Sequence, residues 1–252
     1  MKEKAKPILC PIITVMSAAL LFTSCVLINI GDSTSRNSIQ AKGEREIYQI
    51  NTGVFSKIKI EGISEVRYYA GSSDTVTLEV PSNVREYHEV LVENGELIIR
   101  TKNRISYGRN NSPILTVYAP SLELVTFEGA GSFTAYDKIT ADKLSLITLG
   151  AGSAKAEIDV NNLTANIAGA GSFNLSGKAQ TASISISGAG DVDALSLQTI
   201  DAAVIMSGTG TVKVNCTGKL DITAGGAGTI EYKGSPNVSL NTSGLVSIRQ
   251  IK

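Results

Sequence analysis

Hydrophobic and polar residues alternate in short runs that recur throughout the second half of the chain. Gly-x-Gly tripeptides interrupt these runs, and their first glycines follow one another at intervals of 18 to 21 residues. Alternation with a period of two is typical of strands that bury one face. The sequence therefore predicts two short strands in each repeat, with a bend at the Gly-x-Gly and a second turn near residues 177–180 and 217–219.

One hydrophobic position recurs four residues before the first glycine of each repeat. It is occupied by Val125, Leu146, Ala165, Ile184, Val204, Ile222 and Leu240. Repeats of this length indicate a solenoid, in which equivalent residues of successive coils lie above one another at a spacing of about 4.8 Å. The abundance of Val, Ile, Ser and Thr argues against stacked helical hairpins. We therefore expect an all-β parallel β-helix of 18 to 21 residues per coil, with Ile184, Val204 and Ile222 stacked in its core.

The repeated glycines are interpreted as structural corners. They are Gly129, Gly131, Gly150, Gly152, Gly169, Gly171, Gly188, Gly190, Gly208, Gly210, Gly226 and Gly228. A tight corner repeated in register needs residues that tolerate positive φ or a crowded backbone, and glycine serves both needs.

Residues 47–128 use the same alternation less regularly. Asn94-Gly95, between two hydrophobic runs, predicts a hairpin with a type I′ turn. We interpret 47–128 as the decorated start of one β-helix domain spanning 47–252, whose regular coils cover 129–252.

The first residues have a different character. Three lysines precede an apolar run at 7–22, which is shorter than the ~20 residues of a membrane span and ends just before Cys25. This segment resembles a bacterial lipoprotein signal, although Phe22 occupies a position where Leu is most usual. The resemblance implies a signal peptide at 1–24, acylation of Cys25 and a flexible polar tether up to residue 46. A plain signal peptide or an uncleaved anchor is the alternative.

Composition narrows the classes of partner. Lys plus Arg and Asp plus Glu each number 23, so the formal net charge is zero. Nucleic acid and anionic membranes are therefore not expected as partners, and membrane contact is expected through the lipid alone. With Cys10 removed and Cys25 acylated, Cys216 would have no partner for a disulfide, so a hydrophobic core must hold the domain.

Three features together resemble the head GIN domain family of putative auto-transporter adhesins. They are the strand FSKIKIEG at 55–62, the segment NGELII at 94–99 and the serial GAGS corners. The resemblance covers about 47–252. It implies a right-handed parallel β-helix at the envelope of a Bacteroidota-type cell, and it supplies no catalytic residues.

Candidate chemistry is sparse. Asp191 and Asp193 lie on one outward strand face, as an acid–base or cation site would require, but a solvated charge ladder is the preferred interpretation. His88, the single histidine, is expected at the surface, and Cys216 is expected to be a buried small hydrophobe. No catalytic residue, metal site or cofactor is therefore expected.

Six tyrosines offer aromatic rings on which sugars could stack, without any sign in the sequence that they converge. They are Tyr68, Tyr69, Tyr87, Tyr107, Tyr118 and Tyr136. Tyr68 and Tyr69 are consecutive in a strand and should point to opposite faces.

These observations favour a non-catalytic, lipid-anchored envelope adhesin that presents its surface to a protein, a glycan or another copy of itself. The outer membrane is the favoured location, with surface and periplasmic display both open. A β-helix polysaccharide lyase or hydrolase, and a periplasmic structural or stress-linked lipoprotein, are the alternatives.

Overall fold

A computed structural model describes residues 38–108 and 111–252. The interpretations of 1–24 as a signal peptide and of Cys25 as a lipid attachment site lie outside these residues. The described residues belong to one compact unit, and within them no helix has the length and apolar character needed to cross a membrane.

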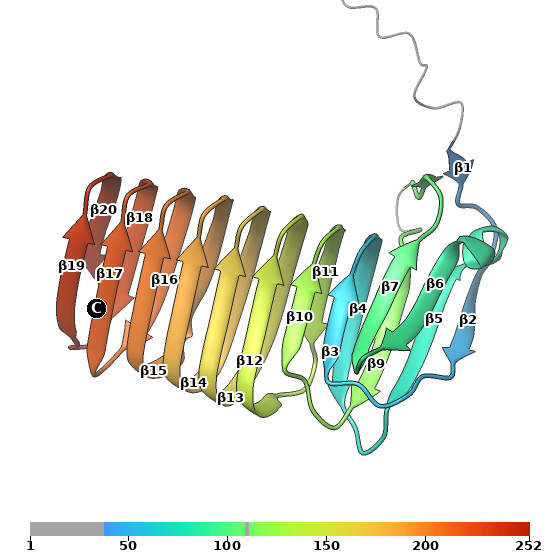
Figure 1. Cartoon of the computed structure of the whole chain (residues 1–252), viewed down its shortest axis with the longest axis horizontal. Coiled ribbons are helices and arrows are strands. Elements are labelled where there is room, and N and C mark those ends of the chain that lie inside the picture. The colour runs from blue at the N-terminus through green and yellow to red at the C-terminus, as the bar shows by residue number, and fades with distance from the viewer. Residues whose placement is uncertain (1–37, 109–110) are drawn as a thin grey trace, which may run out of the picture. The chain divides into compact units, whose positions relative to one another are not determined.

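The regular half is a stack of parallel coils with two faces (Figure 1). One face holds β10 (Leu124–Phe127), β12 (Ile139–Thr148), β17 (Lys219–Ala224) and β19 (Asn237–Thr242). The other holds β11 (Ala130–Ala135), β16 (Thr209–Cys216), β18 (Ala227–Lys233) and β20 (Leu245–Gln250). The long strands β13 (Ala151–Ile167), β14 (Ala170–Ile186) and β15 (Ala189–Met206) each contribute to both faces. The predicted parallel β-helix is confirmed as a solenoid of about seven turns.

The hydrophobic column predicted from the sequence forms the core from Val125 to Ile222, but the prediction is wrong for its last member, Leu240, which is 56% exposed. Ile184 pairs with Val204, and Val204 pairs with Ile222, on three successive coils. All three side chains are buried. Each coil thus contributes a side chain whose apolar surface is removed from water, which is favourable for folding. Together these side chains form a continuous hydrophobic interior along the stack.

The Gly-x-Gly corners stack in register, with Gly131, Gly152 and Gly171 paired on consecutive coils. Crowding is the dominant reason for the glycines. A Cβ on Gly171 would lie 2.3 Å from the carbonyl oxygen of Gly152. A positive φ is a second reason for glycine at only some of these corners, such as Gly210, where φ is 144°.

The first half does not follow chain order. Strands β3 (Lys57–Ile60) and β4 (Ile63–Ala70) form a coil that pairs with β10 and β11 on one side. On the other side they pair with β7 (Glu96–Thr101) and β9 (Ile114–Ala119). In the sequence, β7 and β9 follow β4 and precede β10. The coil formed first in sequence therefore lies inside the stack.

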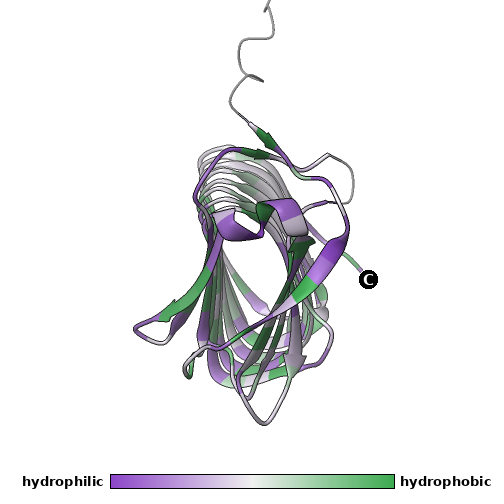
Figure 2. Cartoon of the chain, turned by 90° about the vertical axis from the view of Figure 1, so that its right-hand side faces the viewer, coloured by the Kyte–Doolittle hydropathy of each residue, from purple (hydrophilic) through white to green (hydrophobic). Residues whose placement is uncertain are grey.

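Antiparallel strands complete this end. Strand β5 (Thr75–Pro81) pairs with β9 and with β2 (Arg45–Ile50), and β6 (His88–Glu93) pairs with β7. Asn94 and Gly95 join β6 to β7 with φ values of 51° and 73°, so the predicted hairpin with positive φ at both turn residues is confirmed. The 3₁₀ helix η1 (Ser82–Tyr87) connects β5 to β6 at this end of the stack, which faces the viewer in Figure 2. A two-residue pairing joins β1 (Ile39–Gln40) to β8 (Ile105–Ser106).

Candidate binding surface

Three tyrosines stack on the outward face of β9 and β4 and at the end of β11. The ring centroids of Tyr69 and Tyr118 are 5.1 Å apart, and those of Tyr69 and Tyr136 are 5.0 Å apart. Tyr118 is 41% exposed and Tyr136 is 55% exposed. We call Tyr118, Tyr69 and Tyr136 the tyrosine ladder. Stacked aromatic pairs are each worth about 0.5–1.5 kcal/mol beyond the area they bury, so the rings hold one another in place.

The strand geometry explains how the ladder forms. Tyr68 points inward, is buried, and donates its hydroxyl to the carbonyl oxygen of Ala119 at 3.0 Å. Tyr69, the next residue, therefore points outward, which confirms the prediction of opposite faces. The convergence with Tyr118 could not be predicted, because β9 reaches β4 only after the excursion through β5, η1, β6 and β7.

Ion pairs border the tyrosine ladder. Arg67 donates to Glu65 at 2.6 Å on the same strand as Tyr69. Lys138 lies 2.9 Å from Glu157, and this hydrogen bond raises the pKa of the Lys138 ammonium. Arg67 and Lys138 are thus each paired with a carboxylate.

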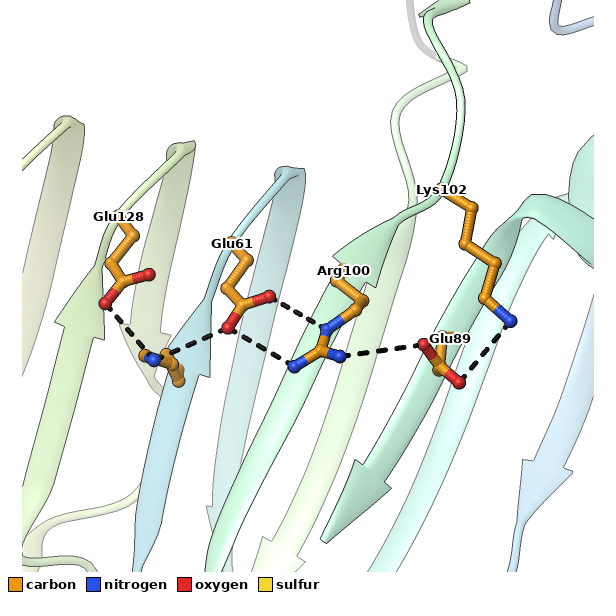
Figure 3. A network of polar contacts seen from close by, with 6 residues as sticks. Glu61, Glu89, Arg100, Lys102 and Glu128 are labelled. Atoms are coloured by element: carbon orange, nitrogen blue, oxygen red, sulfur yellow. Dashed lines mark hydrogen bonds and ion pairs between the residues drawn. The ribbon is translucent and has the colours of Figure 1, made fainter. Parts of the chain in front are cut away.

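On the opposite face of the solenoid, a chain of alternating charges crosses four neighbouring strands (Figure 3). Lys59 lies 3.2 Å from Glu128 and 3.4 Å from Glu61, and Arg100 donates to Glu61 at 2.8 Å. Arg100 and Lys102 both contact Glu89, which extends the chain to β6. The pKa of Lys59 is raised, chiefly by its hydrogen bond to Glu128. These side chains satisfy one another across neighbouring coils, and part-exposed ion pairs of this kind each contribute at most about 1 kcal/mol.

The two aspartates considered as a candidate site accept backbone hydrogen bonds. The N–H of Thr211 donates to Asp191 at 2.8 Å, and the N–H of Leu195 donates to Asp193 at 3.2 Å. Bonds of this kind fix corners and turns locally. Their geometry is that of structural hydrogen bonding between and within coils.

The expectation that His88 lies at the surface is wrong. Its side chain is only 3% exposed, and its ring nitrogens lie 3.1 Å from the Tyr107 hydroxyl and 3.4 Å from the Thr101 hydroxyl. Burial, assisted by the nearby Arg85 guanidinium, lowers the pKa of His88 to about 4. Thr101 is the partner of His88 on the neighbouring strand β7, and Tyr107 comes from the segment after β8; no feature of a lone histidine in the sequence indicates this enclosure.

Cys216 is fully buried, as predicted. Its thiol donates to the carbonyl oxygens of Ile200 at 3.0 Å and Lys219 at 3.2 Å. Burial raises the pKa of this thiol, which disfavours the thiolate needed for nucleophilic chemistry. Across residues 38–108 and 111–252, no three His, Cys, Asp or Glu side chains are grouped so as to hold a metal ion.

A family profile described as "Putative auto-transporter adhesin, head GIN domain" matches residues 54–236. The chain belongs to this family. The resemblance inferred from the strand at 55–62 and the GAGS corners is thereby confirmed. A search of curated proteins gave no match.

Several solved structures share this fold. A putative adhesin from Bacteroides fragilis superposes with a TM-score of 0.79 at 23% identity, covering 85% of this chain and 100% of its own. A putative lipid binding protein from Parabacteroides distasonis has a TM-score of 0.67 at 22% identity, covering 86% and 100%. A putative adhesin from Parabacteroides merdae has a TM-score of 0.62 at 20% identity, with the same coverage. At these identities the likeness establishes the fold.

Proposed function

We propose that this head GIN protein is a non-catalytic adhesin of the cell envelope that binds a macromolecular ligand through the tyrosine ladder. The stack of Tyr118, Tyr69 and Tyr136, in which the two outer rings are exposed, is the observation that carries the proposal. Tyrosine gives a large, amphipathic contact area at low entropic cost, because its side chain has only two rotatable torsions.

The surroundings of the ladder suit a preformed interface. Tyr69 and Tyr118 lie on strands of the solenoid and Tyr136 directly follows one, and parallel backbone hydrogen bonds fix the register of these strands. A ligand therefore meets side chains that are already ordered, which lowers the entropy that binding must overcome. The family description as adhesins supports the same interpretation.

The chemistry of the ionisable groups supports binding over catalysis. His88 is buried with its pKa far below neutrality, and Cys216 is a buried thiol whose pKa is raised. Glu61 and Glu89 are engaged in ion pairs, and Asp191 and Asp193 accept backbone hydrogen bonds. None of these groups is placed as a free acid or base beside a second one.

The proposal includes lipid attachment at Cys25, which rests on the sequence of residues 1–25 alone. Replacement of Cys25 by Ser should abolish incorporation of radiolabelled fatty acid and move the protein from the membrane fraction to the soluble fraction. Unchanged labelling and fractionation would contradict this part of the proposal. Protease treatment of intact cells then distinguishes surface from periplasmic display.

The binding surface is tested by adhesion of cells that display the full chain to immobilised matrix proteins and glycans. Tyr136→Ala should weaken adhesion, whereas Leu149→Ala should leave it unchanged, since Leu149 is a similarly exposed side chain (52%) at a corner away from the ladder. Equal adhesion by both variants would refute a role for the ladder. Release of new reducing ends or unsaturated products from a polysaccharide panel would instead favour the lyase or hydrolase alternative.

A further inference from the structure

A groove of about 510 Å³ crosses the second turn of consecutive coils, on the edge formed by β13, β14, β15 and β16. It is separate from the tyrosine ladder, which lies on β4 and β9 and at the end of β11. Its origin is visible in the register of the strands. Strand β15 carries extra residues at this turn, so the pairing with β16 shifts between Ala194 and Gln198.

The floor of the groove is a column of inward-facing residues. Ala179 pairs with Val160 on one side and with Thr199 on the other, and all three are buried. The Thr199 hydroxyl donates to the carbonyl oxygen of Asn215 at 2.8 Å, so the floor carries a satisfied polar group. Because Ala179 and Thr199 are small, the floor lies below the side chains that flank it.

The two walls are the outward residues on either side of this column. One wall is formed by Asp159, Lys178, Gln198 and Asn215, which pair in register from β13 to β16. Asn161, Gln180 and Ile200 belong to the other wall. The walls therefore repeat at the coil spacing of about 4.8 Å and run along the axis of the stack.

Three wall side chains have unused hydrogen-bonding capacity. Lys178, Gln180 and Gln198 make no side-chain hydrogen bond or ion pair within the part of the chain that the structure describes, although they lie together on adjacent coils. Each glutamine offers both donor and acceptor atoms. By contrast, Asn161 is already engaged with Asp142 at 2.8 Å, and Asn215 with the carbonyl oxygen of Leu195 at 3.3 Å.

The groove matches the chemistry of a saccharide. Each sugar hydroxyl group both donates and accepts hydrogen bonds. The glutamine side-chain amides can pair with it either way, because they carry both N–H donors and a carbonyl acceptor. Ile200, which is 55% exposed, offers an apolar surface for the C–H face of a sugar ring. The walls carry one acid, Asp159, and one base, Lys178, so the groove favours an uncharged ligand over a polyanion.

We infer that this groove binds a neutral oligosaccharide lying along the axis of the solenoid, with Gln180, Gln198 and Lys178 bonding its hydroxyl groups. The inference goes beyond the proposed role of the tyrosine ladder, since it assigns a second site and the ligand class of that site. It does not require that the ladder bind the same molecule.

The test is titration calorimetry of the purified full chain, held in a detergent without a sugar head group, with short oligosaccharides of glucose, mannose and galactose. Polygalacturonate serves as the anionic counterpart. The variant Gln180→Ala/Gln198→Ala removes two hydrogen-bonding partners and should weaken binding by about tenfold. Gln49→Ala, an exposed glutamine on β2, and Tyr136→Ala, on the tyrosine ladder, should bind like the unaltered chain.

Thermal unfolding of each variant verifies that the fold is intact; both glutamines are exposed, so no change is expected. Binding of at least one neutral oligosaccharide, weakened selectively by the double variant, supports the inference. Equal binding by the double variant, preference for polygalacturonate, or failure of every neutral oligosaccharide to bind would overturn it. Persistent adhesion through the tyrosine ladder in any of those cases would show that the proposed function stands without the groove.

Discussion

A side chain on Gly188 would place its Cβ 1.9 Å from the carbonyl oxygen of Gly169, on the preceding coil. The two backbones approach closely because the N–H of Ala189 donates to that same carbonyl oxygen at 2.9 Å. The corner therefore needs glycine at position 188, because a side chain there would prevent the close approach that this hydrogen bond between coils requires.

Gly188→Ala is accordingly expected to destabilise the protein by about 1–3 kcal/mol or more, because the backbone must move to accept the methyl group. Chemical denaturation gives the change in free energy of unfolding. Ala189→Ser is the matched control, since the exposed Ala189 is the next residue of the same corner and should tolerate the change within about 0.5 kcal/mol. An unchanged unfolding midpoint for Gly188→Ala would count against crowding as the reason for the glycine.

Two positions of the hydrophobic column predicted from the sequence should respond differently to truncation, because only one of them is buried. Ile222 is 1% exposed, whereas Leu240, its partner on the next coil, is 56% exposed. Ile222→Ala should cost about 2–5 kcal/mol in unfolding free energy through lost burial and a residual cavity. Leu240→Ala should cost much less, and similar losses for the two variants in denaturant titrations would contradict this assignment of the core.

The tyrosine ladder should contribute to stability through its central ring. Tyr69→Ala removes both stacked pairs and should cost about 1–3 kcal/mol, given about 0.5–1.5 kcal/mol for each pair. Tyr69→Phe keeps both ring contacts and should remain close to the unaltered protein. If Tyr69→Phe destabilised the fold as much as Tyr69→Ala, the phenol hydroxyl, and not the stacking, would be responsible.

His88 predicts a dependence of stability on pH. The folded state holds the imidazole neutral, with its pKa at about 4 against an ordinary value of 6.5. The unfolded chain therefore binds a proton at this imidazole more readily than the folded protein does. The contribution of His88 to the free energy of unfolding is complete above pH 6.5 and is lost as the pH falls toward 4. The loss should reach about 2–3 kcal/mol.

Urea unfolding of the unaltered protein and of His88→Gln, measured at neutral pH and near pH 4.5, isolates this contribution. The glutamine variant should lose less stability between the two conditions, since it has no imidazole to protonate, even if it is less stable at neutral pH. Parallel losses in the two proteins would mean that carboxylates alone cause the acid sensitivity.

The regular coils could be predicted because their information is local. The position of Val204 is fixed by its distance from the glycine corner and by the same spacing in the neighbouring repeats. The tyrosine ladder could not be predicted, because Tyr118 meets Tyr69 only through the return of β9 to the side of β4. The burial of His88 could not be predicted either, since the side chains of Thr101 and Tyr107, which contact its ring, come from beyond the hairpin turn.

The placement of the coil formed by β3 and β4 bears on how the chain reaches its native state. This coil has later strands on both flanks, β7 and β9 on one and β10 and β11 on the other. A polypeptide delivered from its N-terminus cannot wind such a solenoid turn by turn, since the earliest turn must wait with both edges open. We therefore expect strands to be added on both sides of this coil, whose edges remain open to wrong pairing until both flanks have formed.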